Sequence, residues 1–186
     1  MSAFPIIKGL TDLLIAGLSA TFTSDPFTAP YSAMIFSDSP ASSGAGTGTK
    51  QGLSFWPYRI VRDEFVADPS LVSLSATQFV IPPLRVDVWY LATPMTGAGD
   101  KDQLLVEKTL QYVYDVGPVA LGDNDAVIAF ETPGQEELFR LWSALDMPYA
   151  LSCVITARHV AIDSMRKPIK GAHVIERFDR YTRMPT

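Results

Sequence analysis

Cysteine and histidine are scarce in this 186-residue sequence, which contains one Cys and two His. A lone Cys153 cannot form a disulfide within the chain, so the fold must depend on packing, as in proteins made in a reducing cytoplasm. Three such residues are also too few for a zinc site built from nitrogen and sulfur ligands. We therefore predict no metal centre and no cofactor.

Positive charge is also limited, because 15 Lys and Arg face 20 Asp and Glu, for a net charge of -5 at pH 7. An acidic chain lacks the long-range attraction to phosphate that a nucleic-acid binder needs. No uninterrupted apolar run approaches the ~20 residues of a membrane-spanning helix. We predict neither a nucleic-acid partner nor a membrane span.

Apolar residues are abundant: 47% of the sequence is hydrophobic and 11% aromatic. Apolar spacing of three and four residues predicts helices, and alternation predicts strands. Helices are expected over residues 3–18, 100–116 and 133–145, and strands over residues 31–36, 53–61, 84–93, 126–131 and 150–163. This order predicts a single α+β domain over residues 1–164, in which a mixed or antiparallel sheet is flanked by about three helices and residues 37–51 form a flexible Gly/Ser loop.

Local patterns predict how several elements begin and where they lie. Pro57 within a strand pattern indicates a sheet edge or a bulge. Asp100 is expected to be the N-cap of the second long helix, and residues 132–135 have the form of a capping box. Along residues 84–93, alternation predicts one buried face and one partly covered face.

Three aromatic residues are expected to pack in the interior rather than bind a ligand. Trp89, Trp142 and Tyr149 fall at strand and helix positions that the patterns predict to be buried. Tyr114 belongs to the expected apolar side of the helix over residues 100–116.

No motif predicts catalysis, and we expect a protein that is not an enzyme. Cys153 and His159 would lie six residues apart on one strand, about 20 Å at 3.3 Å per residue, too far to act as nucleophile and base. Cys153 is expected to be a small buried hydrophobe. The glycine-rich residues 44–50 lack the Gly-Lys-Ser/Thr succession of a phosphate-binding loop.

The C-terminal residues 165–186 differ in composition and are expected to form a basic arm. Residues 164–186 carry a net charge of +4, whereas the rest of the chain carries -9. This asymmetry indicates an arm that seeks an acidic surface, although a solvated, frayed end is the alternative. The apolar Val174, Ile175, Phe178 and Tyr181 favour docking.

Several segments together resemble the cap, or tail-terminator, proteins of phage-tail-like extracellular contractile injection systems. The match lies in the segments GLSFWPYRI (52–60), PPLRVDVWYLAT (82–93), LLVEKTLQYVYD (104–115) with Pro118, and ELFRLWSAL (137–145) continuing through Pro148 and Tyr149 to residue 164. It spans the first helix to about Ser164. Val116 and Gly117 stand where an Asn-Pro pair is expected, and the Gly-rich loop and the arm lie outside the resemblance.

The resemblance implies a structural role and a fold like that of phage tail terminators. It implies a hexameric ring of this chain on the distal end of the contractile sheath and inner tube, which terminates and stabilises assembly. Such a protein would be assembled in the cytoplasm and become part of a particle that stays there or is released. A closed ring needs unlike, complementary patches on each copy.

We hypothesise that residues 169–181 pair with a strand of a neighbouring cap subunit or of the sheath. The expected interface residues are Ile169, Val174, Ile175, Arg177, Phe178, Arg180, Tyr181 and Arg183. Two alternatives stay open: a small α+β enzyme or ligand-binding protein with an unrecognised pocket, and an arm that binds nucleic acid through Arg177, Arg180 and Arg183.

Overall fold

A computed structural model describes residues 5–44, 51–63, 72–75, 78–121, 124–166 and 169–170. Its helices are α1 (Ile6–Thr23), η1 (a 3-10 turn, Ala29–Tyr31), α2 (Pro40–Gly44), α3 (Gly99–Val116) and α4 (Gln135–Ala144). Its strands are β1 (Ile35–Phe36), β2 (Leu53–Arg62), β3 (Val72–Ser75), β4 (Gln78–Val80), β5 (Leu84–Pro94), β6 (Pro118–Leu121), β7 (Asn124–Glu131), β8 (Cys153–Ile162) and β9 (Ile169–Lys170).

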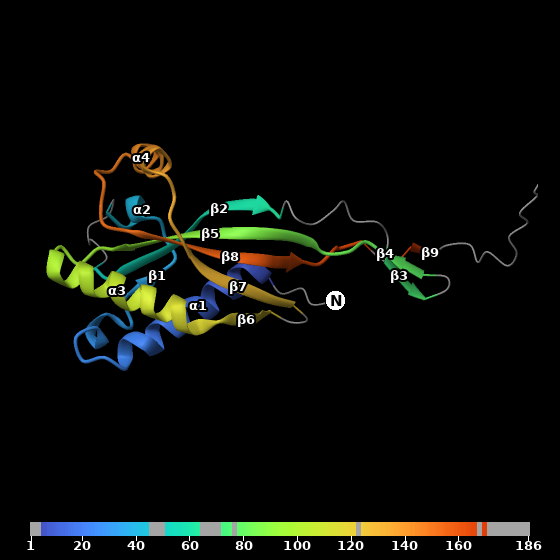
Figure 1. Cartoon of the computed structure of the whole chain (residues 1–186), viewed down its shortest axis with the longest axis horizontal. Helices are drawn as coiled ribbons and strands as arrows, with labels where there is room; N and C mark the ends of the chain where they lie inside the picture. Colours follow the sequence, from blue (N-terminus) through green and yellow to red (C-terminus); the bar gives the residue numbers. More distant parts are fainter. Residues whose placement is uncertain are drawn as a thin grey trace, which may run out of the picture.

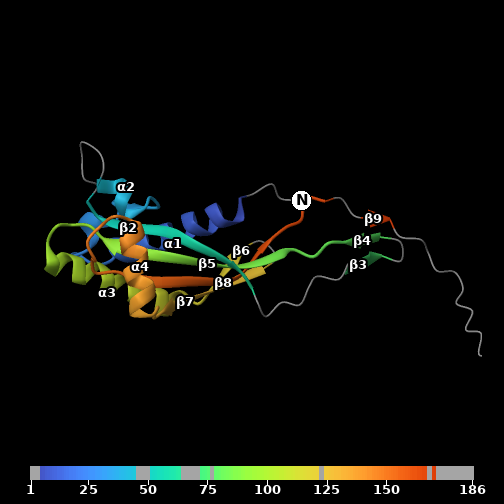
Figure 2. The same ribbon diagram turned by 90° about the horizontal axis from the view of Figure 1, so that it is seen from above.

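Six strands form the main sheet, in the order β1-β2-β5-β8-β7-β6. Only β1 and β2 are parallel, so the sheet is mixed, as predicted. A smaller antiparallel sheet of β3, β4 and β9, which we call the distal sheet, lies beyond one end of the main sheet (Figure 1, Figure 2). The α+β class and the three long helices are confirmed, while α2, β3, β4, β6 and β9 were not predicted. Helix α2 lies within residues 37–51, which were expected to form a flexible loop.

Helices cover both faces of the main sheet, α1 and α3 on one and α4 on the other (Figure 1). On the first face the apolar stripe of α1 packs with Leu105 and Val113 of α3 against Val88 and Tyr90 of β5. On the second face Trp142 of α4 packs on Leu91 and Val154. The structure therefore confirms the buried face and the partly covered face that the alternation along β5 predicted.

The predicted helix caps are wrong. The N-cap of α3 is Ala98 and that of α4 is Gly134, and neither side chain supplies a capping hydrogen bond. Asp100 lies in the first turn of α3 instead. Asp102 holds this end by accepting hydrogen bonds from the backbone N–H (3.0 Å) and the hydroxyl (2.7 Å) of Thr96. The carboxylate of Asp102, in the first turn of the helix, thus orders the loop that precedes it. Sequence motifs that consider only the N-cap position do not predict this contact.

Among the described helices, α1 is the one that is long and apolar enough to cross a membrane. In this fold, the apolar composition of α1 is explained by burial of its side chains. Leu10, Leu14, Leu18 and Phe22 are fully buried against the sheet, and the buried Thr11 hydroxyl lies 3.0 Å from that of Tyr90. Helix α1 therefore packs as a core helix of the α+β domain.

This packing predicts unequal effects of two neighbouring leucines on α1. Replacing the buried Leu14 by Ala removes core contacts and should lower the free energy of unfolding by about 2–5 kcal/mol. Replacing Leu13, which is 50% exposed, should change it by less than about 0.5 kcal/mol. Urea unfolding followed by circular dichroism measures both values, and equal losses would contradict this packing of α1.

Candidate assembly surface

The structure describes only the beginning of the predicted arm. Ile169 and Lys170 form β9 and pair with Phe79 and Gln78 of β4 in the same chain. The other expected interface residues, Val174, Ile175, Arg177, Phe178, Arg180, Tyr181 and Arg183, lie outside the described residues. Their role as an interface remains a prediction. The arm leaves the described structure from the distal sheet, at the end of the molecule farthest from α3 and α4 (Figure 1).

One open edge of the main sheet belongs to β2. Strand β1 pairs with Leu53 and Ser54 only, and within the described residues no strand pairs with the remainder of this edge. The pairing of β2 with β5 shifts register between Pro57 and Arg59, which confirms the edge or bulge predicted from Pro57. A proline, a β-bulge and a charged side chain such as that of Arg59 each hinder the pairing of an exposed edge strand with a strand of another chain.

The second open edge belongs to β7, on the opposite side of the sheet. Strand β6 pairs only with residues 124–127 of β7, whereas residues 128–131 pair with β8 and, within the described part of the chain, with nothing on their other side. These four residues lack the proline and the bulge found in β2. They form the less protected of the two edges.

An apolar groove runs beside this edge, between α3 and β7. It has a volume of about 490 Å³ and is lined by Leu110, Val113, Tyr114, Ile128, Ala129 and Phe130. The side chain of Phe130 is 50% exposed and that of Tyr114 is 90% exposed. The expected burial of Tyr114 is thus wrong, because this residue lies at the rim of the groove and not against the sheet.

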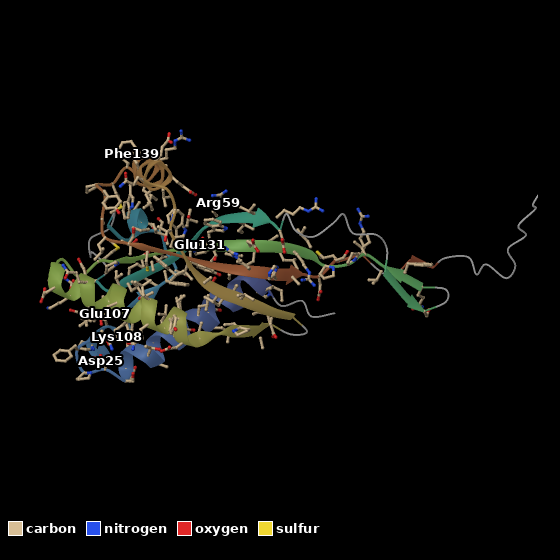
Figure 3. All side chains as sticks on the ribbon, in the orientation of Figure 1. Asp25, Arg59, Glu107, Lys108, Glu131 and Phe139 are labelled. Atoms are coloured by element: carbon tan, nitrogen blue, oxygen red, sulfur yellow. The ribbon has the colours of Figure 1, made fainter. Side chains whose placement is uncertain are left out.

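The elements around the groove carry an excess of negative charge. Helix α3 and strands β6 and β7 together contain six carboxylates and two lysines. One of these lysines, Lys108, is engaged in a mostly buried ion pair with Asp25 at 2.8 Å (Figure 3). This contact lowers the pKa of Asp25 and raises that of Lys108. Among the carboxylates, Glu131 is paired with Arg158 of β8, and Asp100 and Asp102 lie in the first turn of α3. Glu107, Asp115 and Asp125 remain as the negative charges that favour a cationic, apolar segment.

The opposite face of the sheet is closed by α4 and one arginine. Arg59 lies over the Trp89 ring, 4.8 Å from its centroid, and donates a 2.7 Å hydrogen bond to Glu137 of α4 (Figure 3). Trp142 is buried, as expected, and Trp89 is half-buried. Tyr149 is 66% exposed, so its expected burial is wrong: it contacts the Trp142 ring edge-on at 6.1 Å with its other side in solvent.

Cys153 and His159, the two residues considered for catalysis, have separate environments in the structure. Cys153 is buried, as expected, and burial raises the pKa of its thiol to about 12. His159 lies on the same strand, and its Nδ1 is 2.8 Å from Oδ2 of Asp63. A polar cleft between α1 and α3 contains the Asp25–Lys108 pair, whose charges neutralise each other.

Comparison with protein families and solved structures gives consistent findings. A family model described as the Pvc16 N-terminal domain matches residues 6–175. The fold is similar to that of the PVC sheath/tube terminator of an extracellular contractile injection system in its extended state, with a TM-score of 0.58 and 14% identity. It is also similar to the tube-terminating cap of the anti-feeding prophage, with a TM-score of 0.56 and 16% identity.

The chain is shorter than both of these structures. The first match covers 100% of this chain and 67% of the terminator, and the second covers 86% of this chain and 60% of the cap. No curated protein matches the sequence.

The burial of Cys153 predicts a thiol that is inert in the folded protein. Burial raises the pKa of the thiol to about 12, which lowers the thiolate fraction at pH 8, and it also blocks the approach of a reagent. The reaction with a disulfide reagent should therefore be at least about tenfold slower than that of a free cysteine. The same chain in urea should react with one equivalent at the rate of a free thiol. Rapid labelling without denaturant would indicate an accessible, activated Cys153 and favour an enzyme.

Proposed function

Because the chain belongs to the Pvc16 N-terminal domain family, we propose that it is a structural cap that terminates the sheath and inner tube of a contractile injection particle. The observation that carries the proposal is the family match over residues 6–175, together with a fold shared with two terminator structures. The proposed partners are the sheath and tube proteins and further copies of this chain. The protein would be assembled in the cytoplasm and then become part of the particle.

We further propose that six copies form a closed ring on the end of the tube. A cyclic ring requires that each copy present two unlike patches, one for each neighbour. The described structure offers two candidates: the distal sheet with the arm that follows it, and the open edge of β7 with its apolar groove. They lie far apart on the molecule (Figure 1), so that one copy could use both at once.

In this ring, the arm of one copy is proposed to add a strand to residues 128–131 of β7 in the next copy. Strand addition obtains affinity from main-chain hydrogen bonds and specificity from the side chains that enter neighbouring pockets. Because Ile169 and Lys170 are already paired with β4, the apolar groups proposed to enter the groove between α3 and β7 are Val174, Ile175, Phe178 and Tyr181. The net charge of +4 on residues 164–186 complements the carboxylates around that groove.

A small-molecule function is the alternative, and the polar cleft between α1 and α3 is the surface that favours it. Its lining residues include Thr21, Asp25, Lys108 and Asp115. The cap proposal is preferred because the two charges at the centre of the cleft are already paired with each other. Electron microscopy discriminates between the two functions: rings or capped tubes support a cap, and a monomer that binds a small ligand supports the alternative.

Deletion of residues 171–186 tests the role of the arm. We expect the truncated chain to remain folded, because the described core lies outside the deleted segment, and to lose ring or particle assembly. The measurement is negative-stain microscopy of particles from cells in which the truncated gene replaces the intact one. Intact, correctly capped particles would refute the role of the arm.

Replacing Arg177, Arg180 and Arg183 by Gln tests the nucleic-acid alternative. Neutralising these side chains should abolish any DNA or RNA binding that the arm provides, whereas the cap proposal predicts that the intact protein shows no such binding. Purified intact protein that binds DNA or RNA with a steep salt dependence would instead favour the nucleic-acid alternative.

Substitution of Phe130 by Asp tests the acceptor edge. A carboxylate cannot make the apolar contacts that the Phe130 side chain is proposed to make with the arm of the next copy. Ring formation should therefore fall by at least about tenfold, a cost of about 1.4 kcal/mol. Because Phe130 is half exposed, the unfolding midpoint should change little. Phe139, which is 69% exposed on α4 (Figure 3), supplies the matched control: Phe139→Asp should form rings normally, and equal behaviour of the two variants would contradict the proposed acceptor.

A further inference from the structure

Three side chains that are distant in the sequence meet on adjacent strands of the main sheet. Asp63 follows the last residue of β2, Asp87 lies on β5 and His159 lies on β8. Because β2, β5 and β8 are neighbours in the sheet, they place two carboxylates and one imidazole together. Their possible ligand atoms all lie within 4.8 Å of one another.

The backbone at this cluster is held in an unusual shape. Val86 pairs with Val160 and Val88 with Ala157, so that Arg158 and His159 both stand opposite Asp87. At this bulge His159 adopts a φ of 63°, in the left-handed region that few residues other than glycine occupy. Its backbone N–H donates a 3.0 Å hydrogen bond to Oδ1 of Asp87, which fixes the bulge. The bulge turns the imidazole toward Asp63.

Asp63 supplies a carboxylate from the interior. Its side chain is 1% exposed, and its Oδ2 is 2.8 Å from Nδ1 of His159. Its backbone N–H donates to the carbonyl of Arg85 at 3.1 Å, which fixes the residue against β5. The side chain of His159 is 43% exposed, so the cluster has a rigid inner side and an outer side open to solvent.

We infer that Asp63, Asp87 and His159 bind a divalent transition-metal ion. Imidazole and carboxylate together suit Zn²⁺, Mn²⁺ or Fe²⁺, whereas Mg²⁺ and Ca²⁺ prefer sites made of oxygen alone. Bonds of about 2.0–2.2 Å place neighbouring ligand atoms roughly 3–3.5 Å apart. The Nδ1–Oδ2 contact of 2.8 Å must therefore open and give up its shared proton while the more distant ligand atoms approach, and the partly exposed side chains of Asp87 and His159 can rotate to allow this. Three protein ligands leave further coordination positions to water.

The position of this site gives it a structural consequence. The cluster lies near the end of the main sheet from which the chain continues toward the distal sheet (Figure 1). An ion bound there would join β2, β5 and β8 at the base of that extension. It would stabilise the folded state by mass action, because the three ligands come together only in the folded chain.

Zinc titration of the full chain without a polyhistidine tag tests this inference. The protein is stripped of metal with a chelator and titrated with Zn²⁺ at pH 7.5 by calorimetry, and the two histidine side chains are followed by ¹⁵N NMR. We expect one equivalent of Zn²⁺ to bind, the Nδ1 resonance of His159 to shift and the melting temperature to rise. His173, the other histidine, should be unaffected.

Two conservative variants and one control make the result specific. His159→Asn keeps a residue that tolerates the left-handed conformation, and Asp87→Asn keeps an oxygen that can accept the N–H of residue 159. Each removes a direct ligand and should weaken Zn²⁺ binding by more than the 10- to 100-fold that loss of an outer-shell partner costs, with a native circular dichroism spectrum, while His173→Ala should bind normally. The absence of one-equivalent binding, unchanged affinity in both variants, or loss of binding in His173→Ala would overturn the inference.

Discussion

Burial of both faces of β5 is the constraint on which the rest of the structure depends. Val88 and Tyr90 point to the layer formed by α1 and α3, whereas Leu91 points to Trp142 of α4. The same strand pairs with β2 on one side and β8 on the other. Strand β5 is therefore covered on both faces and paired along both edges. This fixes its register, because a shift of one residue would move every side chain to the opposite face.

The regular parts of this arrangement could be predicted from sequence because they follow local periodicity. The stripe on α1, the alternation along β5 and the proline in β2 each indicated the element that the structure contains. Contacts between distant residues could not be predicted in this way. The exposure of Tyr114 and Tyr149 depends on which elements pack nearby, and short strands such as β6 and β9 exist only because a partner strand lies beside them. His159 meets Asp63 across 96 positions of sequence, so no spacing pattern could indicate the pair.

The same physics explains how the edge of a sheet can serve as a specific binding surface. Edges of a sheet are normally protected, as β2 is by Pro57 and the bulge beside it. The edge of β7 next to Phe130 and Tyr114 is left unprotected within the described residues, and it lies among carboxylates. An edge of this kind risks aggregation unless a defined partner covers it. In the proposed ring, the basic, apolar arm of a neighbouring copy would be that partner.

Isolation of a tagged copy from its native cells tests the central claim, that this protein works as a lid on a tube built by other chains. The account predicts that sheath and tube proteins are recovered with it, identified by mass spectrometry, and that electron microscopy of the same sample finds the tag at one end of each tube. Recovery of the chain alone, as a monomer from cells that contain such tubes, would contradict the account.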